Sequence, residues 1–243
     1  MLDDIDFDKY LRITTRDDKP YLDIDLILAD PNPRQMLMNY LHMDTNDVNY
    51  EIFLGLPNTG PTLALAMAQY AGRRYVRARK GKRLNENEYL RILYRESESE
   101  VQNPLERKGR RHLQMRREAL KKNINSQDGT LLKTALLIDG LLEDGDKALE
   151  TARKLKEIGI KSSFFCVVEL KDWDGKQRRG RELLEQEGIR VGSIRAYENG
   201  KYENGSITKT QNRQPIIDEK RGIILPGGER PKVRFEDADY DIH

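Results

Sequence analysis

The second half of the chain repeats an apolar run followed by a helix-length segment, and this alternation restricts the fold more than any other feature. Residues 134–138 (TALLI) and 162–170 (SSFFCVVEL) are apolar runs of strand length. The segments KALETARKLKEIG and RGRELLEQEG follow them, and residues 189–197 (IRVGSIRAY) end the series. Strands that alternate with helices of this length form parallel βαβ units. The sequence therefore predicts an α/β fold with a parallel sheet flanked by helices.

The first half of the chain continues the same pattern. Residues 21–28 (YLDIDLIL) alternate apolar and acidic side chains and predict a strand, after which Asp-Pro-Asn-Pro at 30–33 opens a helix. Residues 50–56 (YEIFLGL) predict a buried strand, PNTGPT a turn, LALAMAQYAG an apolar helix, and residues 73–78 another strand. Beyond residue 196, two turn signals in ENGKYENGS predict a short hairpin, and we expect a loose polar tail after it.

Charge is placed unevenly along the chain. The net charge is only +2, but residues 73–122 hold 17 Lys or Arg against 7 Asp or Glu, which leaves −8 on the remainder. Leu105, Leu113 and Leu120 recur at about two helical turns and predict a weak amphipathic helix, part of an inserted helical hairpin. A basic segment of this kind is either a solvated surface or a contact for phosphates or a protein partner. Both interpretations stay open at this point.

Composition narrows the class of protein. No apolar run approaches the roughly 20 residues of a transmembrane helix, and the acidic start MLDDIDFDKY lacks a signal-peptide pattern. We therefore expect a cytoplasmic protein with no membrane partner. The single cysteine excludes an internal disulfide, and the three histidines are too scattered for a zinc site.

The segment TALLIDGLLEDGDKALETARKLKEIG is the most informative for function. Its apolar strand ends at Asp139, a loop containing Gly145 follows, and a helix begins at once. Ligands of open α/β sheets bind at the carboxyl ends of strands, and helix N-termini attract anions. The segment resembles the phosphoribosyl pyrophosphate loop of type I phosphoribosyltransferases.

Five other segments extend the resemblance, which is nearest in layout to orotate phosphoribosyltransferases. RITTRDDKPYLDIDLILADP is similar to their N-terminal hood, and FLGLPNTGPTLALAMA to the glycine-containing loop that handles diphosphate. YVRARKGKR is similar to the start of their mobile basic loop, and VVELKDWDG to the strand whose end helps hold orotate. The order of these segments matches over roughly residues 10–196, and GIRVGSI looks like the last sheet strand.

The resemblance implies a type I phosphoribosyltransferase fold with a small hood and a long basic insertion. We expect a hood and first helix at 1–45, the two halves of the core at 46–77 and 133–196, the insertion or mobile loop at 78–132, and a hairpin and tail at 197–243. It also implies a ribosyl donor such as phosphoribosyl pyrophosphate, a nucleobase as the second substrate, Mg²⁺ as cofactor and a homodimer.

The resemblance also implies a set of site residues. Asp139 would hold the ribose hydroxyls and would meet Mg²⁺ only indirectly, through the diphosphate. The other donor-binding residues would be Asp144, Gly145, Asp146 and Lys147 at the 5′ end, and Thr59, Gly60 and Arg77 at the diphosphate. The catalytic candidates are Asp139, Glu143, Lys80 and Lys82, and the base-binding candidates are Lys171 and Trp173.

The sequence departs from the family pattern at positions that bear on chemistry. Gly140 stands where the family has a second acidic residue, and Thr14 and Thr15 stand where its hood has Lys-Ser. The loop EDGDK is acidic, and a carboxylate about 5 Å from a phosphate dianion repels it by roughly 2–7 kcal/mol at effective dielectrics of 20–80. Alternatively, Asp144 or Asp146 caps the helix.

Two functions remain open from the sequence. The first is a phosphoribosyltransferase-like enzyme of nucleotide metabolism with altered substrate specificity, including a donor that lacks the 5′-phosphate. The second is a catalytically inactive protein of the same fold with a binding or regulatory role. Its nucleic-acid or protein contact would use the basic residues of 78–122.

Overall fold

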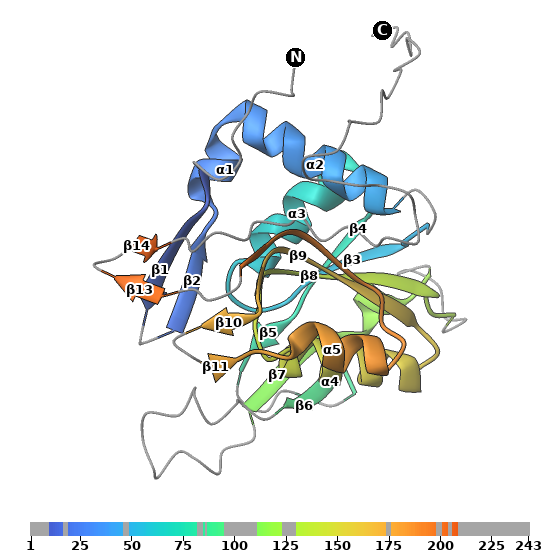
Figure 1. The fold of residues 1–243 in the computed structure, drawn as a ribbon. Helices are drawn as coiled ribbons and strands as arrows, with labels where there is room; N and C mark the ends of the chain where they lie inside the picture. The colour runs from blue at the N-terminus through green and yellow to red at the C-terminus, as the bar shows by residue number, and fades with distance from the viewer. Residues whose placement is uncertain are drawn as a thin grey trace, which may run out of the picture.

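A five-stranded parallel sheet forms the centre of the molecule (Figure 1). This computed structural model describes residues 10–16, 19–45, 49–81, 85, 87–94, 111–122, 130–173, 176–197, 201–203 and 206–208. The strand order is β12-β9-β8-β3-β4. The strands are β3 (Ile52–Gly55), β4 (Arg74–Arg77), β8 (Thr134–Leu142), β9 (Lys161–Leu170) and β12 (Val191–Tyr197). The predicted α/β architecture is confirmed.

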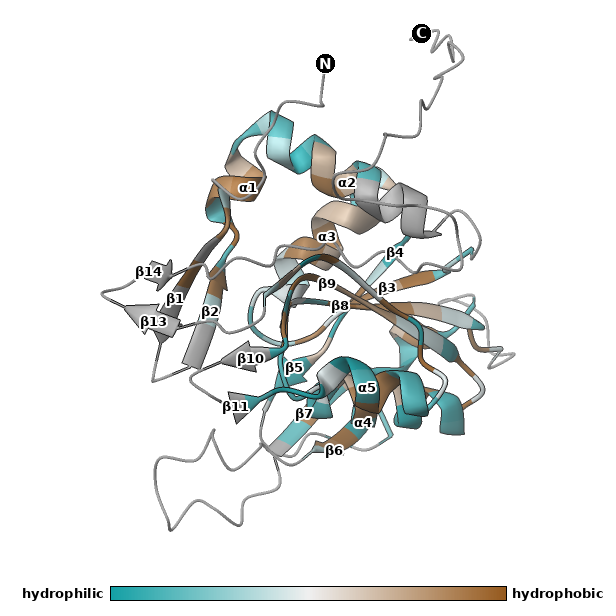
Figure 2. Cartoon of the chain, viewed as in Figure 1, coloured by the Kyte–Doolittle hydropathy of each residue, from teal (hydrophilic) through white to brown (hydrophobic). Residues whose placement is uncertain are grey.

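Helices cover both faces of this sheet, as expected for parallel strands joined by helical crossovers. On one face lie α2 (Pro31–Thr45) and α3 (Gly60–Tyr70), and on the other α4 (Asp146–Glu157) and α5 (Gly180–Gln186) (Figure 1). Each face has its own apolar core, and Figure 2 shows the apolar residues concentrated along the sheet and on the helix sides that face it. The core therefore fixes the positions of the loops at the strand ends.

The N-terminal segment is a hairpin rather than one long strand. Strands β1 (Arg12–Arg16) and β2 (Lys19–Asp23) pair antiparallel, and helix α1 (Asp25–Ala29) follows. The predicted strand over 21–28 is therefore wrong beyond Asp23. The Asp23 carboxylate accepts the backbone N–H of Asp25 at 3.0 Å, a local contact that favours a turn over an extended chain.

The predicted C-terminal hairpin is present. Strands β13 (Lys201–Glu203) and β14 (Ser206–Thr208) pair antiparallel, and β14 lies beside β1 (Figure 1). The predicted tail beyond these strands lies outside the described residues.

The basic insertion contains strands, so the predicted helix over 105–122 is wrong in its described part. Strands β5 (Arg79–Lys80), β6 (Tyr89–Tyr94) and β7 (Arg111–Arg116) form an antiparallel sheet in the order β5-β7-β6, and a 3₁₀ turn (Arg117–Leu120) follows. Alternate apolar residues of β6 and β7 are buried against the α4 side of the core, and Gln114, between Leu113 and Met115, is buried as well. This period of two, rather than the spacing of the leucines, decides the local structure.

One contact fastens the end of the insertion to the central sheet. The Arg74 guanidinium on β4 donates to the backbone carbonyls of Lys121 and Lys122 at 2.5 and 2.6 Å.

Among the described residues, no helix is long and apolar enough to cross a bilayer.

Candidate functional site

The carboxyl ends of β3 and β8 meet the turn that opens α3. An ideal Cβ on Gly60 would lie 2.3 Å from the Ile138 carbonyl oxygen, and one on Gly55 would lie 2.5 Å from the Pro61 Cα. Both positions therefore need glycine because backbone occupies the space of a side chain. This close approach places Thr59 and Gly60 next to Asp139, as the predicted donor site requires.

Asp139 is buried at the carboxyl end of β8 and is the one charged residue of that strand, all of which the structure describes. One carboxylate oxygen accepts the Gly140 N–H at 2.7 Å, and the other lies 3.7 Å from the Lys147 ammonium. Burial raises the pKa of Asp139 from 3.8 to about 6, although Lys147, the Gly140 N–H and Lys80 each favour the ionised form. Near neutral pH the site therefore contains a desolvated carboxylate beside two cations.

Strand β5 carries the predicted catalytic residue Lys80 beside Arg79. Arg79 pairs with Gln114 and Lys80 pairs with Leu113, so the two cations leave the strand on opposite faces. Lys80 is exposed, and its charge is the weakest of the influences that lower the pKa of Asp139. Arg77 is exposed at the end of β4, and Lys82 lies outside the described residues.

The structure explains why position 140 is a glycine, which the sequence alone does not. A Cβ at this position would lie 2.1 Å from the Thr59 Oγ1, 3.0 Å from the Thr59 Cβ and 3.4 Å from Leu22. Thr59 is itself buried, so the surroundings cannot accept a side chain without moving. The site is thus built around a single carboxylate, Asp139, at the end of β8.

The acidic loop 143–147 opens α4 without a side-chain cap. The N-cap residue is Gly145, in the left-handed conformation at φ 78°, so the capping role considered for Asp144 or Asp146 is wrong. Asp146 is in the first turn, where its charge is favourable beside the helix dipole. Asp144 instead accepts a hydrogen bond of 2.8 Å from the Arg178 guanidinium, whose side chain is only 7% exposed.

The start of α5 supports the same loop through its backbone. The Gly180 N–H donates to the Glu143 carbonyl at 2.9 Å, and a Cβ on Gly180 would lie 2.1 Å from that oxygen. Sequence reasoning missed both Arg178 and Gly180 because they follow the loop by more than thirty residues, and only the basic run KQRRG hinted at them.

The predicted base-binding residues lie just beyond β9. The Lys171 N–H donates to the Tyr197 carbonyl at 2.9 Å, and the Lys171 carbonyl accepts from the Arg178 N–H at 2.7 Å. Trp173 belongs to strand β10 (Asp172–Trp173), which pairs with β11 (Lys176–Gln177), but its side chain lies outside the described part. Base binding by Trp173 therefore stays a prediction.

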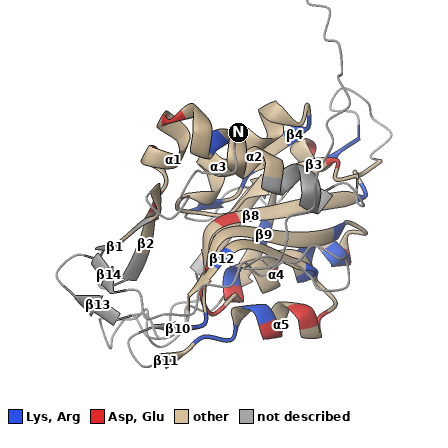
Figure 3. Cartoon of the chain, turned by 45° about the horizontal axis from the view of Figure 1, so that its top comes forward, with Lys and Arg blue, Asp and Glu red and all other residues tan. Residues whose placement is uncertain are grey.

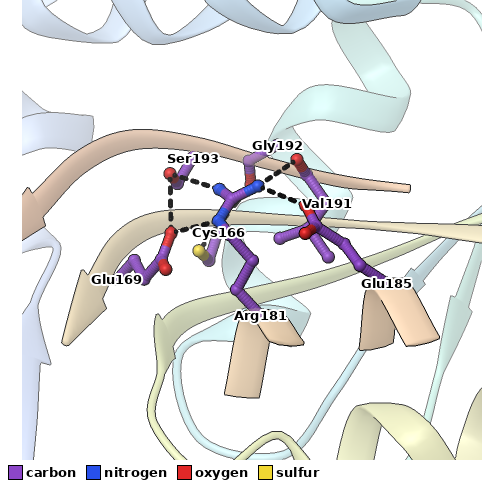
Figure 4. Close-up of polar contacts among 7 residues, drawn as sticks. All are labelled: Cys166, Glu169, Arg181, Glu185, Val191, Gly192 and Ser193. Carbon is purple, nitrogen blue, oxygen red and sulfur yellow. Dashed lines mark hydrogen bonds and ion pairs between the residues drawn. The ribbon is translucent and has the colours of Figure 1, made fainter. Parts of the chain in front are cut away.

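A buried polar cluster fastens α5 to the sheet (Figure 4). The Arg181 guanidinium donates to the Glu169 and Glu185 carboxylates at 2.8 and 3.0 Å, to the Val191 carbonyl at 3.0 Å and to the Ser193 hydroxyl at 3.2 Å. Glu169 is 3% exposed, so the ion pair with Arg181 offsets part of the cost of burying both groups. By holding α5, the cluster also holds the segment that supports the acidic loop.

Two further observations bear on chemistry. Cys166 lies in the same cluster, where its thiol donates to the Gly192 carbonyl at 3.7 Å, and burial raises its pKa well above the ordinary value (Figure 4). It is therefore a core thiol at neutral pH.

Among the described residues, no group of three or more His, Cys, Asp or Glu side chains is placed to hold a metal ion.

The charged residues are distributed around a largely uncharged sheet. Figure 3 shows β8 and β9 mostly free of Lys, Arg, Asp and Glu, whereas α5 carries both signs. Asp139 at the end of β8 is thus an exception within the sheet.

No family model matches the sequence, but solved structures with the same fold exist. Adenine phosphoribosyltransferase from Rhodothermus marinus is 18% identical, with a TM-score of 0.59 over 77% of this chain and 94% of that chain. The enzyme of the same name from Thermoanaerobacter pseudethanolicus is 19% identical, with a TM-score of 0.59 over 83% and 100%. That from Trypanosoma brucei, in complex with AMP, pyrophosphate and ribose-5-phosphate, is 11% identical, with a TM-score of 0.60 over 89% of both chains.

These similarities show the fold. The predicted type I phosphoribosyltransferase fold is confirmed, with its central parallel sheet flanked by helices. The finer resemblance to orotate enzymes stays a prediction, since these three structures are adenine enzymes.

Proposed function

We propose that this chain is a phosphoribosyltransferase-like enzyme that transfers a ribose phosphate between diphosphate and a nitrogenous base. The observation that carries the proposal is Asp139, a buried carboxylate beside Lys147 in the last part of β8, next to the loop that opens α4. The fold supports it, because ligands of open α/β sheets bind at this edge. The Trypanosoma brucei enzyme of the same fold was solved in complex with AMP, pyrophosphate and ribose-5-phosphate.

The donor would be held at both ends. Its 5′-phosphate would lie at the N-terminus of α4, where backbone N–H groups and the helix dipole favour an anion. Arg178 offsets the charge of Asp144, which weakens the repulsion expected from the acidic loop. Asp139 would accept hydrogen bonds from the ribose hydroxyls. A phosphorylated donor is therefore favoured over the unphosphorylated one that the acidic sequence suggested.

The diphosphate would leave toward Thr59, Gly60, Arg77, Lys80 and Lys82. Positive side chains and backbone N–H groups stabilise the charge that develops on a leaving diphosphate. The anomeric carbon becomes positive in the same step, so an ionised Asp139 also favours the transition state.

Magnesium fits this arrangement as a companion of the substrate. Mg²⁺ commonly binds one or two carboxylates together with substrate phosphates, and the described residues provide no all-protein cage. Asp139, with one oxygen bonded to Gly140, would meet the ion only indirectly. When bound, the ion would neutralise charge on the departing diphosphate.

The base would bind between the carboxyl end of β9 and the N-terminal hood. Lys171 is the cation available to an acidic base such as orotate, and Trp173 is a candidate to stack on any base. Glu143, whose carbonyl fixes the start of α5, remains the candidate acid or base at the loop.

Turnover with a panel of bases tests the proposal. Phosphoribosyl pyrophosphate and Mg²⁺ are incubated with adenine, guanine, hypoxanthine, uracil or orotate, and released diphosphate is measured. We expect one base to support turnover and Lys80→Ala to reduce it, because Lys80 is one of the cations that we assign to the diphosphate. Arg79→Ala is the matched control, since it removes the neighbouring cation on the opposite face. No turnover with any base, or equal loss in both variants, contradicts the proposal.

A specific observation favours a second candidate function. The space beside Thr59 excludes a second carboxylate at position 140, so the site keeps only one of the two that the family resemblance implies. A non-catalytic protein that binds the donor as a regulatory ligand would need only one. Donor binding without turnover on the base panel would support this alternative.

A further inference from the structure

The antiparallel sheet β5-β7-β6 has two different faces. Leu90, Ile92, Leu113 and Met115 point into the core and are at most 2% exposed. The register pairs the alternate residues across the strands, and directly opposed residues share a face. The outer face therefore carries Tyr89 with Arg116, Arg91 with Gln114, Leu93 with His112, and Arg79 with Gln114. Gln114 is only 3% exposed, so the accessible part of this face lies around Arg79, Leu93 and Arg116.

This outer face is basic and belongs to the most basic part of the chain. The described residues between 73 and 122 comprise 11 Lys or Arg and only 2 Asp or Glu. Arg79 and Arg116 are exposed, and Arg91 is half-buried. A surface with this excess of one sign attracts polyanions and raises their association rate.

Rings and apolar groups lie among these arginines. The Arg116 guanidinium is 5.9 Å from the centroid of the Tyr89 ring and donates to its hydroxyl at 3.3 Å. The Arg91 guanidinium donates to the His112 ring at 3.0 Å. Leu93 is 38% exposed on the same face, although leucine is usually buried. Charge alone would attract any anion, whereas rings and apolar surface also suit the flat faces of bases.

We propose that the outer face of the β5-β7-β6 sheet binds single-stranded nucleic acid. Arg79, Arg91 and Arg116 would contact successive phosphates, and Tyr89 and Leu93 would contact the bases. Positive surfaces with interspersed aromatic rings bind single strands without strong sequence preference. A duplex fits less well, because its bases are stacked inside and its major groove admits two strands rather than three.

This surface is separate from the proposed donor site. Lys80, which we assign to the diphosphate, leaves β5 on the face opposite Arg79. The proposal is therefore independent of phosphoribosyl transfer, and either can fail without the other.

Fluorescence anisotropy with labelled 20-nucleotide RNA and DNA tests the proposal on the full chain, between about 50 and 200 mM salt. We expect micromolar binding to single strands that weakens as salt rises, with a logarithmic slope of about −2 for three phosphate contacts. The double variant Arg79→Glu/Arg116→Glu changes two exposed residues and should lose at least about tenfold in affinity.

A charge-matched control separates this surface from general attraction. Lys156→Glu/Lys161→Glu makes the same change in net charge at two exposed positions on α4 and β9. It should bind within about threefold of the unmodified protein. Equal loss in both double variants overturns the proposal, as does absence of binding at low salt. Tighter binding of duplex or of a poly-glutamate peptide also overturns it.

Discussion

Replacement of Arg178 by alanine tests whether the acidic loop 143–147 can accept the phosphate of the proposed donor. Arg178 donates to the Asp144 carboxylate at 2.8 Å, and the side chains are 7% and 26% exposed. Without this partner, the Asp144 charge would face the donor's 5′-phosphate uncompensated. We therefore expect Arg178→Ala to weaken donor binding specifically.

The magnitude follows from the geometry of the loop. A carboxylate about 5 Å from a phosphate dianion repels it by roughly 2–7 kcal/mol, depending on the effective dielectric. Asp144 is partly exposed, so solvent screening favours the lower end. A penalty of about 2 kcal/mol corresponds to roughly thirtyfold weaker binding.

Titration calorimetry with phosphoribosyl pyrophosphate and Mg²⁺ provides the assay, and Asp144→Asn provides the rescue. Removal of the carboxylate charge should restore the Arg178→Ala variant to within about fourfold of the unmodified protein, less than 1 kcal/mol. Asp144→Asn alone should bind the donor at least as tightly as the unmodified protein. A purely structural role for Arg178 predicts no rescue, because the buried gap would remain. A double variant as weak as Arg178→Ala would therefore refute the electrostatic reasoning.

Three further predictions follow from buried groups. The pKa of Asp139 is raised from 3.8 to about 6, so the folded state binds its proton more tightly, and stability relative to Asp139→Asn should fall by about 3 kcal/mol as pH rises from about 3 to 7; urea unfolding of both proteins across this range measures it. Gly140→Ala should cost about 1–3 kcal/mol of unfolding free energy, and Thr59→Ala in the same chain should recover part of that loss because it removes the contacting hydroxyl; a double variant no more stable than Gly140→Ala would contradict the steric account. Arg181→Ala should cost about 3–5 kcal/mol because it leaves a buried carboxylate unpaired, whereas Arg179→Ala, in an exposed pair, should cost under about 1 kcal/mol by thermal unfolding.

The central sheet was predictable because its strands are buried on both faces. Such strands appear in the sequence as continuous apolar runs, as in β8 and β9, and the helices between them have the length of a crossover. The position of Asp139 in the last part of a strand was predictable for the same reason, but the predicted end of that strand at Asp139 is wrong, because β8 continues to Leu142. The local sequence was therefore sufficient to predict the strands and helices that position the site.

The insertion was not predictable because its pairing is long-range. Strands β6 and β7 are separated in sequence by residues 95–110, and Leu90, Ile92 and Tyr94 alternate within a strongly charged background. The surroundings of Gly140 depend on Thr59, eighty-one residues away, so no local pattern could reveal them. Tertiary contacts, rather than propensity, decide both features.

Donor binding is the most direct test of the central claim, that Asp139 and the α4 loop form a ribosyl-donor site. Phosphoribosyl pyrophosphate with Mg²⁺ is titrated calorimetrically into the unmodified protein and into Asp139→Asn at pH about 7.5, where the carboxyl is ionised. The account predicts micromolar binding to the unmodified protein and at least about tenfold weaker binding to the variant. No heat of binding at millimolar donor, or equal affinities for the two proteins, would contradict it.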